Sequence, residues 1–184
     1  MNALAIVRRL HEHRAWVNGK LLTAADTLPM SRLTQPLAIG QGSLWKTLVH
    51  LFAAEFVWLE ALEGNPDPLL PGDVRGKLPG NQEGEGALGD VDELRRSWLA
   101  LEDRWRAYLE RLSVEDLERD VLKVSTSSGK GKTHVTRRAD VLLHVCTHAQ
   151  YTTAQAINMM RQLGVHELPD VMLISLARQQ GASG

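Results

Sequence analysis

Two histidines stand four residues apart in the segment LLHVCTHAQYTTAQ, which begins at Leu142. In a helix, positions i and i+4 project from one face about one turn apart, so His144 and His148 can point at the same metal ion. The pair alone is weakly specific, because it lacks the glutamate of the H-E-x-x-H metalloprotease motif. It also has a structural interpretation, in which both imidazoles hydrogen-bond to a carbonyl, to water, or to Thr152 and Gln155.

His50 is the natural third ligand. It lies in the apolar segment GSLWKTLVHLFAAEFVWLEALEG, where an unpaired imidazole is costly to bury. Three histidines from two packed helices would leave an open coordination position on Zn²⁺ or a similar divalent ion, as a catalytic site requires. The sequence therefore predicts a metal site at His50, His144 and His148, with no residue that presents itself as a general base.

Other reactive side chains have simpler interpretations. Cys146 projects about 100° to 200° away from both His144 and His148 on a helical wheel, which predicts a buried structural thiol. Glu55 follows His50 by five residues and is expected to be a carboxylate of the bundle interior, an interface, or the surroundings of the site. The remaining histidines are expected to be solvated: His11, His13, His134 and His166.

The apolar spacing that must position these residues is helical along nearly the whole chain. Four long helices are predicted, at residues 3–25, 43–64, 90–112 and 136–163, with a short helix in the tail HELPDVMLISLARQQ. Ser43 and Asp90 are favourable N-caps, and Gly64 and Gly164 end two of the helices. The third helix has the clearest seam, with apolar residues at alternating spacings of four and three: Leu94, Trp98, Leu101, Trp105, Tyr108 and Leu112.

The connections are rich in glycine and proline. Residues 29–42 are predicted to form a loop with one short turn, and residues 65–89 a long surface loop. The segment VLKVSTSSGKGKTHVT is predicted to form a small hairpin or an irregular loop. The overall prediction is an all-α bundle with long connecting loops.

Composition narrows the class of protein. A length of 184 residues favours one domain, residues 1–184. The 21 Lys and Arg residues nearly balance the 22 Asp and Glu residues without a basic block, which argues against a nucleic-acid partner. The single cysteine excludes an internal disulfide, and no apolar run at the N-terminus suits a signal peptide or a membrane span. A cytoplasmic location is expected.

Taken together, GSLWKTLVHLFAAEFVWLEALEG and the later LLHVCTHAQYTTAQAINMMRQLG resemble the DinB/YfiT-like family of metalloenzymes. The resemblance implies an up-down-down-up four-helix bundle. It also implies a divalent metal ion, commonly Zn or Ni, bound by histidines of the second and last helices. Carried over to this chain, those ligands fall on His50 and His148.

The chain departs from the family at Thr152 and Thr153, where the family often has a further histidine and then an arginine. Three outcomes follow: His144 supplies the third ligand, Thr152 or water completes a weaker site, or the metal is lost. The first is preferred, because imidazole is a far better ligand than a neutral hydroxyl.

Two functions compete on these grounds. One is a metal-dependent enzyme of the hydrolase or thiol S-transferase type, acting on a small molecule such as a thiol. The other is a non-catalytic binding or stress-response bundle with a degraded metal site. Di-iron chemistry is disfavoured because position 141, three residues before His144, is Val rather than Glu. A homodimer is expected from the apolar residues on two sides of the second helix.

Overall fold

A computed structural model describes residues 2–126 and 129–181 of the chain. Six α-helices, one 3₁₀ helix and one pair of strands form within these residues. The four long helices are α1 (Ala3–Ala25), α3 (Leu44–Leu62), α4 (Val91–Glu110) and α5 (Arg138–Gln162). The shorter elements are α2 (Met30–Leu33), η1 (Glu115–Glu118), β1 (Asp120–Val124), β2 (Thr133–Arg137) and α6 (Leu173–Gly181).

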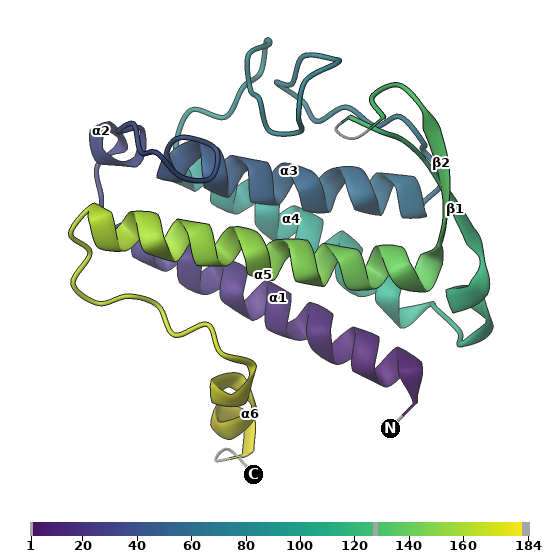
Figure 1. Cartoon of the computed structure of the whole chain (residues 1–184). Coiled ribbons are helices and arrows are strands. Elements are labelled where there is room, and N and C mark those ends of the chain that lie inside the picture. The colour runs from purple at the N-terminus through teal and green to yellow at the C-terminus, as the bar shows by residue number, and fades with distance from the viewer. Residues whose placement is uncertain (1, 127–128, 182–184) are drawn as a thin grey trace.

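The long helices pack in two parallel pairs of opposite direction (Figure 1). Close to the end of α4, the Leu109 carbonyl accepts from Arg8 near the start of α1, so α1 and α4 are antiparallel. Arg104 pairs with Glu60 late in both of their helices, so α3 and α4 run the same way. The observed order is therefore up-down-down-up, with α1 and α5 running one way and α3 and α4 the other.

The helix boundaries follow the capping residues. The Ser43 hydroxyl accepts a hydrogen bond from the Lys46 N–H at 3.2 Å, and the Asp90 carboxylate accepts one from the Glu93 N–H at 2.8 Å. Glu93 in turn accepts from the N–H of Gly89, which completes a variant capping box. Gly64 adopts φ of 100°, the left-handed conformation that ends a helix and favours glycine.

The predicted seam of α4 forms part of the core. Its residues are all buried: Leu94, Trp98, Leu101, Trp105, Tyr108 and Leu112. Helix α3 is buried on several sides, against α5, α4, α2 and β1 of the same chain. The apolar faces of α3 are therefore covered within one chain and give no argument for a dimer.

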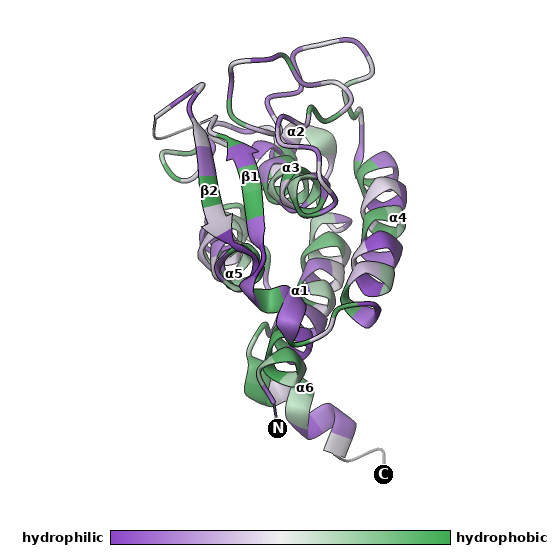
Figure 2. Cartoon of the chain, turned by 90° about the vertical axis from the view of Figure 1, so that its right-hand side faces the viewer, coloured by the Kyte–Doolittle hydropathy of each residue, from purple (hydrophilic) through white to green (hydrophobic). Residues whose placement is uncertain are grey.

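The chain is mostly helical, as predicted, but not strictly all-α, because β1 and β2 form a two-stranded antiparallel sheet. Leu122 lies opposite Val135 and Lys123 opposite His134 in its register. Thr136 and Arg137 belong to this sheet, which is why α5 begins at Arg138 rather than at the predicted residue 136. Figure 2 shows the hairpin on the side of the bundle formed by α3 and α5, away from α4.

A buried ion cluster ties three of the long helices together. Arg14 of α1 pairs with Glu55 of α3 and with Glu102 of α4. Glu55 also accepts hydrogen bonds from the Asn18 amide and the Trp98 indole N–H. Because the carboxylate of Glu55 is held in the bundle interior by these donors, it belongs to the interior as expected and not to the surroundings of the histidines.

Candidate metal centre

A cavity of about 530 Å³ lies between α3, α5, the hairpin and the loop that follows α3. All three predicted ligands, His50, His144 and His148, line it. The hairpin closes another side with Lys123 and His134. The rest of the lining is apolar or carries hydroxyls: Ala54, Val57, Trp58, Leu78, Pro79, Val124, Ser125, Thr126, Val135 and Thr136.

The three predicted histidines form a contiguous row of rings. The His148 ring lies between the other two, with its centroid 5.3 Å from that of His50 and 5.8 Å from that of His144. His144 also makes an edge contact with the Trp58 ring at 5.2 Å. The fold therefore brings together His50 of α3 with the pair one turn apart on α5, as the sequence predicts.

The ring of His50 is held by the loop after α3. Its Nδ1 lies 2.8 Å from the carbonyl oxygen of Pro79, so Nδ1 carries the proton and donates it. The lone pair is then on Nε2. Metal-binding histidines in proteins are oriented in this way by a carbonyl or carboxylate on the other nitrogen.

A glycine allows the loop to approach so closely. Gly80 has φ of 83°, and a Cβ at this position would lie 2.7 Å from the Cα of His50. The Gly80 N–H donates to Asp73 at 2.7 Å, which fixes the turn. The segment predicted only as a long surface loop thus positions a ligand candidate, and a glycine directly after a proline was the signal in the sequence.

The environment keeps the α5 histidines neutral. Burial lowers the pKa of His148 to about 4, with a further contribution from the nearby His50 and His144. Partial desolvation also lowers the pKa of His144, which is more exposed than His148. Imidazole binds a metal only in its neutral form, so both side chains are ready to act as ligands at neutral pH.

His148 is less buried than the apolar pattern of α5 predicts. It is only partly buried and faces the cavity, whereas Thr152 and Thr153 are enclosed in the bundle. Neither threonine lines the cavity. The side chain expected as an alternative ligand, Thr152, therefore points into the core instead of toward the histidines.

Imidazole nitrogens are suitable ligands for a divalent ion, and the distance between the rings of His50 and His148 allows both to bind one ion. Two imidazoles on one ion with Zn–N bonds near 2.1 Å have ring centres roughly 5 Å apart, close to the 5.3 Å between His50 and His148. His144 lies farther from His148 and packs on Trp58. Among the residues that the structure describes, no three His, Cys, Asp or Glu side chains already stand at metal-binding positions.

Three other reactive side chains lie apart from this cavity, and two of them, His11 and His13, differ from expectation. His11 and His13 are buried rather than solvated, and their Nε2 atoms bond to the carbonyls of Leu142 and Val171. Burial lowers the pKa of His11 to about 3. Cys146 faces a separate cavity beside α1, and burial raises its pKa to about 12, as befits a structural thiol.

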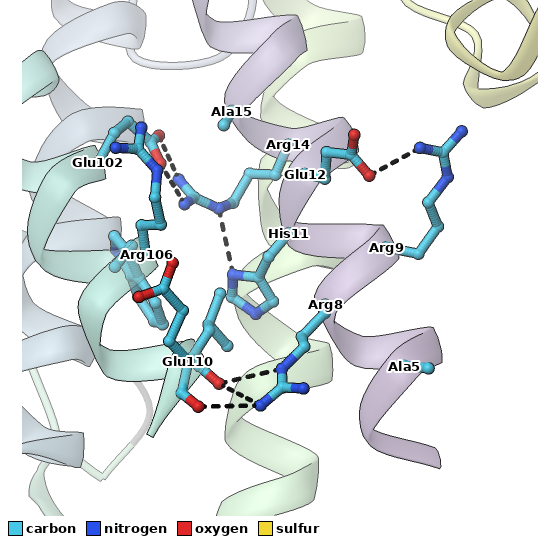
Figure 3. Close-up of a pocket in the computed structure, with 12 residues that line it drawn as sticks. Ala5, Arg8, Arg9, His11, Glu12, Arg14, Ala15, Glu102, Arg106 and Glu110 are labelled. Atoms are coloured by element: carbon cyan, nitrogen blue, oxygen red, sulfur yellow. Dashed lines mark hydrogen bonds and ion pairs between the residues drawn. The ribbon is translucent and has the colours of Figure 1, made fainter. Parts of the chain in front are cut away.

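A larger cavity of about 660 Å³ lies between α1 and α4 (Figure 3). Most of its charged groups already have partners: Arg14 lies between Glu102 and His11, Arg9 pairs with Glu12, and Arg8 donates to backbone carbonyls at the end of α4. The histidine cavity is therefore the stronger candidate for chemistry.

Comparison with known proteins agrees with this architecture. The sequence of residues 1–180 matches the DinB family. The solved structure of YfiT from Bacillus subtilis, described as a probable metal-dependent hydrolase with an unusual four-helix bundle topology, aligns with a TM-score of 0.63 and 17% identity. The alignment covers 86% of this chain and 87% of YfiT. No curated protein matches the chain.

Proposed function

This chain belongs to the DinB family, and from that premise we propose that it is a metal-dependent enzyme whose divalent ion is held by His50, His144 and His148. Zn²⁺ and Ni²⁺ are the ions expected, since borderline divalent ions favour imidazole ligands. The observation that carries the proposal is the ring of His148 lying between those of His50 and His144 in a cavity large enough for a small molecule.

When bound, such an ion polarises a carbonyl or lowers the pKa of a water or thiol in its open position. The chain's own residues supply the rest. The Pro79 carbonyl fixes the His50 ring, and Trp58 packs against His144. The hairpin forms one side of the cavity.

Hydrolysis is the first reaction type we propose. Among the described residues of the lining, the titratable side chains besides the three proposed ligands are Lys123 and His134 of the hairpin. The expected substrates are small enough for a cavity of about 530 Å³.

Thiol transfer is a second candidate, favoured by one observation. Among the described residues that line the cavity, none is Asp or Glu. A thiol, with an ordinary pKa of about 8.5, needs far less help from a base than water does at about 15.7. A cavity without a carboxylate therefore suits a thiol nucleophile.

A paired assay separates the two reactions. Zn²⁺- or Ni²⁺-loaded protein is tested against a panel of small esters, amides and lactones, and then against electrophiles with a small thiol as co-substrate. We expect turnover in one panel, abolished by chelation and restored by the ion. Full activity of metal-free protein would contradict the proposal, and loaded protein inactive in both panels would favour a non-catalytic binding bundle.

A further inference from the structure

A lysine faces the histidine cavity from the hairpin. Side chains alternate between the two faces of a strand, and in β1 the inward positions are Val121 and Lys123, which are 3% and 7% exposed. Leu122 between them is 53% exposed. The inward position that an apolar residue would ordinarily fill thus holds a cation.

Lys123 has no carboxylate partner among the described residues. Its Nζ donates to the Val124 carbonyl at 3.0 Å and lies 5.9 Å from the centre of the Trp58 ring. The nearby Asp67 forms its ion pair with Arg75 instead. Burial lowers the pKa of Lys123, and the negative charge of the nearby Asp67 offsets only part of that effect.

The cavity has no negative charge of its own to balance this cation. His134 lies directly opposite Lys123 in the sheet, and both line the cavity. None of the described residues of the lining is acidic. The cavity therefore presents an ammonium group and a second nitrogen donor on the wall formed by the hairpin, next to the histidines of α3 and α5.

We propose that Lys123, with His134 beside it, forms a binding subsite for the carboxylate group of a small anionic substrate. The inference rests on the proposed function, because it assigns the substrate class of the same cavity. A single ammonium group matches a monoanionic carboxylate better than a phosphate, which proteins usually bind with several donors from a glycine-rich loop or arginines. The buried charge of Lys123 is then balanced by the substrate.

A pair of probes that differ only in charge tests the subsite. Ni²⁺-loaded protein is titrated with 3-mercaptopropionate and with its neutral amide, and binding is followed by the thiolate-to-nickel charge-transfer absorption. We expect the acid to bind about tenfold more tightly than the amide, the effect of one charge-assisted hydrogen bond. Lys123→Met should lower the affinity for the acid to that for the amide and leave the affinity for the amide unchanged. Lys123→Arg should retain a preference for the acid.

Lys132→Met is the matched control, because it makes the same substitution at an exposed position of the same hairpin. It should leave the preference for the acid unchanged. Equal affinities in the unmodified protein, or a preference that persists in Lys123→Met, would overturn the subsite.

A metal-free arm separates this proposal from the metal site. In EDTA-treated protein, 3-mercaptopropionate should shift the backbone NMR signals of Lys123 and His134, and the amide should not. If those shifts occur but nickel never binds, the subsite stands and the metal proposal fails. If the acid shifts neither signal and gives no charge-transfer band, the subsite is wrong.

Discussion

The rings of His50 in α3 and His148 in α5 meet edge to face, with their centroids 5.3 Å apart. Both side chains reach the cavity from the wall formed by two antiparallel helices, which the up-down-down-up order places side by side. Each ring has a nitrogen suited to a shared ion, because His50 donates its Nδ1 proton to Pro79 and burial holds His148 neutral. This pair is the core of the proposed metal centre.

The contact of the loop with His50 predicts an effect of Gly80. A Cβ there would meet the backbone of His50 at 2.7 Å, so Gly80→Ala must move the loop and with it the Pro79 carbonyl. We expect metal affinity to fall about 10- to 100-fold, as for the loss of other groups that orient a ligand. Titration with Zn²⁺ against a competing chelator measures this loss.

Gly86→Ala is the control for that experiment. Gly86 has φ of 80°, close to the 83° of Gly80, but nothing lies within 4 Å of an added Cβ. Both variants carry the same backbone strain, and only one carries the clash with α3. Equal metal affinities in the two variants would show that the loop does not position His50.

The buried ion cluster predicts a large loss of stability on removal of its cation. Arg14→Met leaves Glu55 and Glu102 without their shared partner, and breaking a buried pair costs about 3 to 5 kcal/mol of the free energy of unfolding. Arg9→Met, which removes an exposed pair with Glu12, should cost less than about 1 kcal/mol. Urea denaturation at about pH 8, above the raised pKa of Glu55, compares the two with the ion pair complete, and similar losses would contradict a structural role for the cluster.

The same cluster predicts a component of the pH dependence of stability. Burial raises the pKa of Glu55 from 4.5 to about 7, and the negative charge of Glu102 adds to the effect. Between those values the folded protein holds a proton that the unfolded chain has released, so stability falls as pH rises from about 5 through 7. Glu55→Gln should remove that part of the slope, measured as the free energy of unfolding at several pH values. An unchanged slope would argue that Glu55 is ionised throughout.

Much of the fold could be predicted from local signals in the sequence. Ser43 and Asp90 begin their helices as N-caps, and the seam from Leu94 to Leu112 is buried. These features depend on residues close together in the chain, where capping and periodicity act. The segment after α4 is compatible with a hairpin or an irregular loop from sequence alone, and the strands that form there move the start of α5 to Arg138.

The site could be predicted only in part, because its surroundings come from distant segments. His50 and the pair on α5 were found from spacing and from the family resemblance, and the structure brings them to one cavity. Pro79 of the loop contacts His50 of α3, and Lys123 of β1 contacts Trp58 of α3. Such contacts between distant segments produce no periodic pattern in the sequence. The inward position of Lys123 becomes visible only once the register of the hairpin is known.

The buried histidines of α1 show the same limit. His11 and His13 stand among charged residues in the sequence and were expected to be solvated, yet both are buried with carbonyl partners on segments far along the chain. A histidine can be buried at modest cost once a carbonyl satisfies its ring. The partner carbonyl of Leu142 or Val171 is supplied by tertiary packing.

The metal content of protein purified without a histidine tag, measured by elemental analysis, tests directly whether His50, His144 and His148 hold an ion. We expect about one equivalent of Zn or Ni per chain, lost in His50→Gln and His148→Gln and reduced in His144→Gln. His166→Gln, which changes an exposed histidine, should keep the full equivalent. Less than about one tenth of an equivalent, after the protein has been offered both ions, would contradict a metal centre at these histidines.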